Sequence, residues 1–189
     1  MSESNTSCPV YRLYKGNSPF EGQSCFADYL NGLLREGKDL PMPWMQAATE
    51  LDALIAASPL TEHVTLYRAT VDVFVAPYIN GSVLAYPAYM STSSTQEGLQ
   101  RHFSTALKGV SAALLTIECE PGAHALNMEL EASFGGHEHE FLLPRCARFQ
   151  LDSIRTSGDR QEMSGLMSPL YADSYTDIKL YDLRYLRGD

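Results

Sequence analysis

The sequence lacks several features that mark common functional classes. Its 189 residues contain only four cysteines and no CxxC pair, so neither a zinc ribbon nor a thioredoxin-type redox site is indicated. A chain of this length can bury a core without disulfide bonds, and we therefore expect buried free thiols in a reducing compartment. No segment approaches the roughly 18 consecutive apolar residues that a membrane-spanning helix requires, so we expect no membrane partner.

Positive charge and nucleotide-binding motifs are also scarce. The 14 lysines and arginines are outnumbered by 23 aspartates and glutamates, which gives a formal net charge of −9. An acidic surface repels phosphate backbones, so no nucleic-acid partner is expected. No GxGxxG motif follows a predicted strand, the segment at residues 32–38 is followed by Asp39 where a P-loop needs Ser or Thr, and no GxSxG nucleophile elbow is present. These absences argue against Rossmann, P-loop and serine-hydrolase sites.

The pattern of apolar residues predicts a single α+β domain. Residues 1–17 are polar, without the basic patch and apolar stretch of a Sec-type signal, and are predicted to be a flexible, loop-forming leader. The domain then spans residues 18–189, with a helical layer at 18–58, where apolar residues recur every three or four positions, and a β-rich body at 60–189. Within that body, strands are predicted at residues 63–70, 83–93, 111–118, 138–143, 147–154 and 177–186, a turn at 80–81, a short helix at 95–107 and irregular chain at 156–175.

Three polar segments stand out from this background. Arg68 lies inside the apolar strand segment LYRA, where a guanidinium is costly to bury unless an anion meets it; the alternative is an arginine at a strand edge in water. Ser91 opens the segment STSS, whose alternative interpretation is an ordinary polar turn. Glu138 and Glu140 would point to one face of a strand, where two carboxylates repel each other, unless that face is simply solvated. None of the three segments identifies a chemistry by itself.

Taken together and in this order, the three segments resemble the arginine–serine–glutamate class of mono-ADP-ribosyltransferases. The matching stretches are residues 66–70, 89–94 and 134–144, and the resemblance extends from about residue 25 to residue 186. The class includes toxins and effectors of pathogenic bacteria and the vertebrate cell-surface enzymes. The resemblance implies the ADP-ribosyltransferase fold, in which N-terminal helices pack on two roughly perpendicular β-sheets with a central NAD cleft.

The resemblance also implies a reaction. The family splits NAD+, its co-substrate, and transfers ADP-ribose to a protein side chain, without a metal, through an oxocarbenium-like transition state. Glu140 would stabilise the charge that develops at C1′, and Ser91 would orient Glu140 and support the ribose. Arg68 would grip the NAD phosphates. Glu138 would accept a proton from the incoming nucleophile, and an acid at that position favours arginine acceptors over threonine or other residues.

Further binding residues follow from the same resemblance. Residues 29–35 resemble the family's NAD-facing helix, and Ala69 stands where the family often has glycine. Phe103 resembles the aromatic residue that stacks on nicotinamide, with a core phenylalanine as the alternative. The expected NAD-binding residues are Asn31, Arg35, Arg68, Ala69, Ser91, Thr92, Ser93, Phe103 and Glu140. The residues expected to recognise the target protein are Phe134, Gly135, Gly136 and Glu138.

The resemblance and the small size of the chain together predict a monomeric effector or toxin. It would be secreted without a Sec signal and act in the cytoplasm of a target cell; otherwise it would be cytoplasmic. Its protein substrate could be a small GTPase, actin, ubiquitin or a division protein, and an immunity protein or a chaperone could accompany it. The acidic surface favours, weakly, a basic docking surface on the target.

Other interpretations stay open at this point. The sequence GHEHE at residues 136–140 is similar to the metal motif of cupin barrels, but no histidine follows His139, so the ligand count argues against a metal site. A cysteine nucleophile has no supporting family pattern. The same residues could hydrolyse NAD+ with water instead of modifying a protein, and the fold could serve as a non-catalytic binding module.

Overall fold

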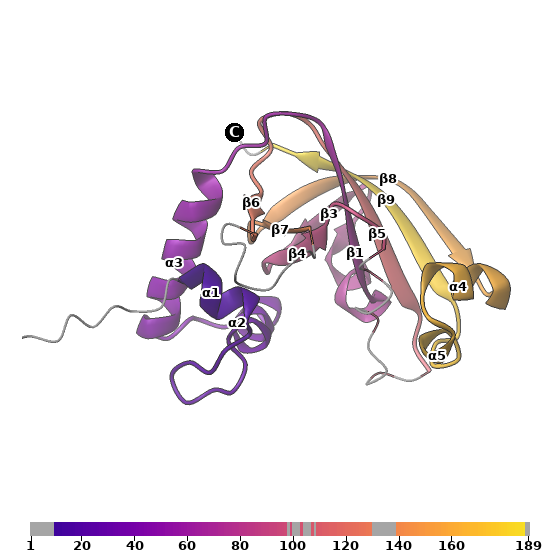
Figure 1. Cartoon of the computed structure of the whole chain (residues 1–189), viewed down its shortest axis with the longest axis horizontal. Helices are drawn as coiled ribbons and strands as arrows, with labels where there is room; N and C mark the ends of the chain where they lie inside the picture. The colour runs from indigo at the N-terminus through magenta and orange to yellow at the C-terminus, as the bar shows by residue number, and fades with distance from the viewer. Residues whose placement is uncertain are drawn as a thin grey trace, which may run out of the picture.

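The computed structural model of the chain describes residues 10–97, 99, 103, 107, 109–129 and 139–187 (Figure 1). Its helices are α1 (Val10–Lys15), α2 (Phe26–Arg35), α3 (Met42–Ala56), α4 (Arg160–Leu166) and α5 (Pro169–Ala172), with 3-10 helices at Asp72–Phe74 and Ala76–Tyr78. Its strands are β1 (Val64–Val71), β2 (Ile79–Asn80), β3 (Val83–Tyr86), β4 (Met90–Ser93), β5 (Ala112–Cys119), β6 (Leu126–Asn127), β7 (Glu140–Leu143), β8 (Ala147–Ser157) and β9 (Ile178–Leu186). None of the described helices is long and apolar enough to cross a membrane.

The strands form a mixed sheet in the order β2-β3-β8-β9-β5-β1-β4-β7-β6. β5 and β9 run parallel, whereas β5 with β1 and β8 with β9 are antiparallel. β1 is paired with β5 along its whole length but with β4 through a single residue pair, Tyr67 with Ser93. The two sheets expected from the sequence are therefore connected at this one pair into a continuous sheet, and the predicted α+β class is confirmed.

The N-terminal helices pack beside the short strands β4, β6 and β7, while α4 and α5 lie at the other end of the sheet (Figure 1). Phe26 of α2 and Trp44 of α3 are buried, and their rings stack with centroids 5.2 Å apart. α3 begins after Pro41 with a second proline in its first turn, where the missing N–H has no helical partner to lose. The helical core includes Leu126 of β6 and Leu142 of β7, so it fixes the helices against this part of the sheet.

Adjacent residues of β7 face two different cores. Leu142 belongs to the core under the N-terminal helices, and Leu143 belongs to the core under the long strands, which also contains Leu115 of β5 and Phe149 of β8. Successive side chains of a strand point to opposite faces, so β7 is packed on both sides. This double packing fixes the position of Glu140, the first residue of β7.

Three segments are helical where the sequence analysis expects irregular chain, namely α1, α4 and α5. Residues 10–15 form α1 and bury Tyr14, so the predicted leader is wrong for this stretch. Residues 160–166 form α4, where the Asp159 carboxylate accepts hydrogen bonds from two backbone N–H groups of the first turn and Met163 is buried. All three helices are short, and the few apolar residues in each of them do not establish a helical period in the sequence.

The predicted strands are confirmed, with shifted ends. The expected turn after Asn80 forms the β2–β3 hairpin, with Gly81 at a φ of +59°. The extended stretch predicted at residues 83–93 is interrupted after β3, because Pro87 cannot donate a ladder hydrogen bond. Most of the helix predicted at residues 95–107 lies outside the described residues.

The cysteines differ from expectation in one respect. Cys25, Cys119 and Cys146 are free, but only Cys119 is fully buried and Cys146 is exposed. Cys146 follows β7 in a left-handed backbone conformation at a φ of +60°, which places it in a surface turn rather than in the core. Cys8 lies outside the described residues.

Candidate active site

A cavity of about 760 Å³ opens between the helical layer and the sheet. Its walls come from α1 and α2 on one side and from β1, β4 and the start of β7 on the other. The expected NAD-binding residues that line it are Asn31, Arg35, Arg68, Ala69, Ser91, Thr92, Ser93 and Glu140. Segments that are distant in the sequence therefore converge on one hollow, as the predicted site requires.

The cavity walls carry more positive than negative charge. Among the described lining residues, the cations are Lys15, Arg35 and Arg68, and the anions are Asp28 and Glu140. The chain as a whole has a formal net charge of −9, so this local excess of cations runs against the overall composition. A cationic hollow in an acidic protein favours an anionic ligand.

Glu140 and Ser91 meet across two paired strands. In the β4–β7 ladder Ser91 lies opposite Leu142 and Ser93 lies opposite Glu140. The Ser91 hydroxyl donates a short hydrogen bond to Oε1 of Glu140, whose side chain is only 13% exposed. One residue further along β4, the Thr92 hydroxyl donates to the Phe141 carbonyl at 2.8 Å and reinforces the same register. The carboxylate is thus fixed at the edge of the cavity, and the contact needed for Ser91 to orient it is present.

Arg68 reaches the same corner from β1. Its Nη1 donates to the Ser91 carbonyl oxygen at 2.7 Å, so its side chain points into the site rather than toward bulk water. This is its one hydrogen bond within the described part of the chain. A guanidinium carries five N–H donors in a planar fork, so Arg68 keeps donors for an anion in the cavity.

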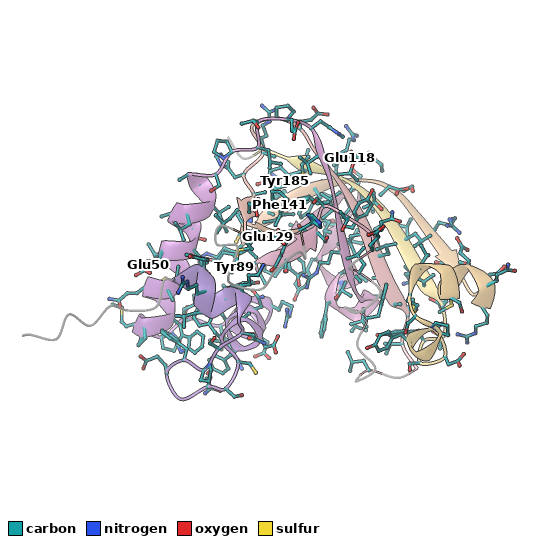
Figure 2. The ribbon with its side chains drawn as sticks, viewed as in Figure 1. Glu50, Tyr89, Glu118, Glu129, Phe141 and Tyr185 are labelled. Carbon is teal, nitrogen blue, oxygen red and sulfur yellow. The ribbon has the colours of Figure 1, made fainter. Side chains whose placement is uncertain are left out.

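Asn31 ties three elements together at the wall of the cavity. Its Nδ2 donates to the Tyr14 hydroxyl at 2.7 Å, and its Oδ1 accepts from the Tyr89 backbone N–H at 3.1 Å. Burial raises the pKa of the Tyr14 phenol well above its ordinary value, so this hydroxyl stays protonated. Tyr89 lies where the helices meet the sheet (Figure 2), and its hydroxyl donates to the Ala48 carbonyl at 2.8 Å. Asn31 therefore has a structural function as well as a place on the cavity wall.

Arg35 lies one helical turn after Asn31 and faces the same cavity. Its guanidinium carbon is 4.8 Å from the centroid of the Phe74 ring, a cation–π arrangement. The Tyr78 hydroxyl donates to the Arg35 carbonyl at 3.0 Å and secures the end of α2. The Arg35 side chain is held in place without an acidic partner being required.

Lys15 is the residue that the sequence analysis missed. It is the last residue of α1, its side chain is 3% exposed, and its Nζ lies 3.6 Å from Oε2 of Glu140. Because residues 10–15 were expected to be loop, nothing in the local sequence placed this lysine next to a carboxylate 125 positions later. The helical pattern of α1, with Val10 and Tyr14 on its buried side, is the one signal that could have pointed to it.

Not every predicted residue is found in the cavity. Phe103 is 1% exposed and packs edge-on against Tyr175 in a core cluster, with ring centroids 6.2 Å apart, and it does not line the cavity. Its stacking on nicotinamide stays a prediction that this position does not favour. The predicted target-recognition residues Phe134, Gly135, Gly136 and Glu138 lie outside the described residues.

No group of three or more histidine, cysteine, aspartate or glutamate side chains that could hold a metal ion occurs within the described ranges. His139 is described and Glu140 faces the cavity, while His137 and Glu138 of the GHEHE segment are outside those ranges. The cavity itself offers guanidinium, ammonium, hydroxyl and amide groups together with the carboxylates of Asp28 and Glu140. Such a set suits an anionic ligand with hydroxyl groups better than a cation.

A match to a protein-family model identifies the family of this chain. The family model described as ADP-ribosyltransferase exoenzyme matches residues 26–167. The chain belongs to the ADP-ribosyltransferase exoenzyme family. The matched region contains Arg68, Ser91 and Glu140 and most of the cavity. No curated protein matches the chain.

Solved structures of bacterial toxins share the fold. Plx2a, an ADP-ribosyltransferase toxin from Paenibacillus larvae, aligns with a TM-score of 0.63 at 19% identity over 94% of this chain and 84% of that one. The C3 exoenzyme of Clostridium limosum aligns with a TM-score of 0.63 at 14% identity over 96% and 87%. Exoenzyme S from Pseudomonas aeruginosa, solved with human 14-3-3 protein beta and bound carba-NAD, aligns with a TM-score of 0.62 at 15% identity over 93% and 70%. The predicted ADP-ribosyltransferase fold is thereby confirmed.

Proposed function

We propose that this exoenzyme-family chain is a mono-ADP-ribosyltransferase of the arginine–serine–glutamate class, which cleaves NAD+ and transfers ADP-ribose to a side chain of a target protein. The observation that carries the proposal is the contact of Ser91 with both Glu140 and Arg68 on the wall of one cationic cavity. Membership of the family and the carba-NAD bound to a structural neighbour support NAD+ as the co-substrate.

The chemistry follows from the position of the carboxylate. Cleavage of the bond between nicotinamide and ribose develops positive charge at C1′, and a fixed carboxylate beside that carbon stabilises it. Glu140 has little contact with water, so its charge is less screened than it would be on the surface. The hydrogen bond from Ser91 keeps the carboxylate in place before the substrate arrives, so little reorganisation is needed at the moment of reaction.

Arg68 and Arg35 are proposed to bind the pyrophosphate of NAD+. Arg68 has unused N–H donors beside the carboxylate, and Arg35 presents its guanidinium from the opposite wall, on α2. A planar guanidinium binds phosphate oxygens through paired hydrogen bonds. Thr92, Ser93, Ala69 and Asn31 complete the expected binding surface along the same walls.

We infer that arginine is the favoured acceptor. Glu138 stands two residues before Glu140 and would take a proton from the attacking guanidino group. Phe134, Gly135 and Gly136 would contact the target protein. The structural neighbours named as a toxin and an exoenzyme support a secreted bacterial effector. We infer further that it acts as a monomer on a protein of another cell.

Labelling with radioactive NAD+ tests this proposal directly. The chain is incubated with labelled NAD+ in eukaryotic and in bacterial lysates, and the labelled protein and its modified residue are identified by mass spectrometry. We expect a labelled protein that carries ADP-ribose on arginine, with labelling that survives a metal chelator. NAD+ cleavage without any labelled protein would instead make the chain an NAD+ glycohydrolase.

Two variants separate the functions of the two glutamates. Glu140→Ala is expected to lose both NAD+ hydrolysis and transfer while the thermal unfolding transition is retained. Glu138→Ala is expected to lose transfer to protein more strongly than hydrolysis, because water needs less help than a guanidinium to attack. If both variants hydrolyse NAD+ like the wild type, the assignment of functions is wrong.

A further inference from the structure

Lys15 is a buried cation with an incomplete set of contacts. Its side chain is 3% exposed, and its Nζ has no hydrogen-bond partner among the residues that the structure describes. An ammonium group has three N–H donors, and a buried donor without an acceptor is costly to the folded state. The nearest anion, Oε2 of Glu140, is 3.6 Å away, which is an ion pair but too long for a good hydrogen bond.

The surroundings of Lys15 show where the missing acceptor must lie. Lys15 lines the cavity together with Arg68 and Glu140, and its Nζ is buried beside the Glu140 carboxylate. Lys15 approaches the carboxylate from α1, on the oxygen that Ser91 leaves free, while Arg68 approaches from β1 and bonds to the Ser91 carbonyl. The two cations therefore flank one corner of the cavity from opposite elements, and both keep unused donors there.

We propose that Lys15 is an NAD+-binding residue whose ammonium exchanges its contact with Glu140 for the pyrophosphate of NAD+ when the dinucleotide binds. This inference rests on the proposed function. It adds a lysine of α1 to the expected NAD+-binding residues. It also explains the contact between Lys15 and Glu140, which pairs the buried ammonium with an anion in the free protein.

Two physical arguments favour the pyrophosphate over the ribose as the new partner. The two phosphates are the only negatively charged groups of NAD+, so they add to the hydrogen bond an attraction between opposite charges that the neutral ribose hydroxyls cannot supply. A cation left against Glu140 would also oppose the positive charge that the carboxylate has to stabilise at C1′. Cleavage is therefore favoured when the charge of Lys15 is met by another anion.

The side chain of Lys15 is suited to such an exchange. Lysine carries a compact charge on a flexible four-carbon stem, so the ammonium can move without a change in the backbone. α1 itself is held by the hydrogen bond from Asn31 to Tyr14, the neighbour of Lys15, so the stem starts from a fixed point. The site changes its charge pairing while the cavity walls stay in place.

Calorimetric titration with ADP-ribose and steady-state kinetics with NAD+ test the exchange. Lys15→Met removes the charge but keeps the length of the side chain. We expect it to weaken ADP-ribose binding and to raise KM for NAD+ by roughly ten- to hundredfold, the range for loss of a hydrogen bond between charged groups, with kcat nearly unchanged. Lys15→Arg should recover most of the binding. Lys38→Met removes the same charge from an exposed lysine paired with Glu36 and should leave binding unaltered.

The outcomes separate this inference from the proposed function. If the wild type binds neither NAD+ nor ADP-ribose, the proposed function fails and the assignment of Lys15 fails with it. If the wild type binds ADP-ribose and Lys15→Met binds it equally well, only the assignment of Lys15 is overturned. A loss confined to kcat would also overturn it, because that result would keep Lys15 on Glu140 during the reaction. A lower melting temperature with unchanged affinity would reduce Lys15 to a structural residue.

Discussion

Charged side chains are arranged in opposite ways on the exposed surface of β8, β9 and α4 and in the enclosed cavity. Between β8 and β9, Arg184 donates two hydrogen bonds to Asp152, at 2.7 and 2.8 Å, and between β8 and α4, Arg155 donates two to Glu162, at 3.1 and 2.6 Å. In the cavity, Arg68 has one hydrogen bond, to a carbonyl, and Lys15 forms none within the described residues. Each of these two exposed arginines forms two hydrogen bonds to a carboxylate, whereas Arg68 and Lys15 form none to a carboxylate within the described residues.

This difference separates charges that serve the fold from charges that serve a ligand. Exposed ion pairs contribute little to stability, because water already solvates both partners. Enclosed cations with unused donors destabilise the folded state, and proteins retain such features mainly at functional sites. The cavity is thus the place where a missing anion would complete the structure, whereas the ion pairs on β8, β9 and α4 are complete without a ligand.

The largest expected effect comes from the carboxylate in the cavity. Glu140→Gln keeps the shape of the side chain and can still accept from Ser91, but it removes the charge that stabilises C1′. We expect NAD+ cleavage to fall by about a hundredfold or more, measured by release of nicotinamide. Asp152→Asn changes an exposed carboxylate of β8, outside the cavity lining, and serves as the control, with turnover close to that of the wild type. Equal losses of NAD+ cleavage in the two variants would show that the carboxylate in the cavity is no more important for the reaction than the exposed one.

A smaller effect is expected at Arg68. Arg68→Lys retains the positive charge but loses the planar fork that can donate to the Ser91 carbonyl and to phosphate oxygens together. We expect KM for NAD+ to rise by roughly tenfold or more, with a smaller change in kcat. The measurement is steady-state kinetics of NAD+ cleavage, with the melting temperature as a check on folding. An unchanged KM would mean that Arg68 only supports β4.

The smallest effect is expected at the ion pair between Arg155 of β8 and Glu162 of α4, and this effect depends on pH. Hydrogen bonds from Arg155 lower the pKa of Glu162 from 4.5 to about 2. A carboxylate whose pKa is lowered on folding stabilises the native state above its unfolded value, and this contribution is lost as the pH falls through the folded value. The melting temperature of Arg155→Gln should therefore be slightly below that of the wild type at pH 7.

The same comparison at low pH sharpens the test. The difference in melting temperature should shrink below pH 4.5 and vanish only once the pH is well below the pKa of about 2, where Glu162 is protonated in both proteins. NAD+ cleavage at pH 7 should be the same in both, because Arg155 lies outside the cavity lining. A difference that grows as the pH falls would show that the pair does not stabilise the fold in this way.

Much of the fold could be predicted from the sequence because its signals are local. The apolar period of α2 and α3, the run of apolar residues in β5 and the turn at Asn80 are properties of short segments. The short helices α1 and α4 could not be predicted, since two or three buried residues do not define a period. Phe103 shows the limit of a resemblance in sequence. Its position resembles that of the family's nicotinamide-stacking aromatic residue, but its side chain is buried in the core.

The sequence alone determined the α+β class and, through the order of arginine, serine and glutamate, the family resemblance, because these depend on residue type and spacing along the chain. Only the tertiary structure decided which charges share an enclosed space. Lys15 and Glu140 are 125 positions apart, and their contact depends on how α1 packs against the short strands. Long-range electrostatic pairing of this kind has no local signature, since it arises from the packing of distant segments and not from the order of residues within any one of them.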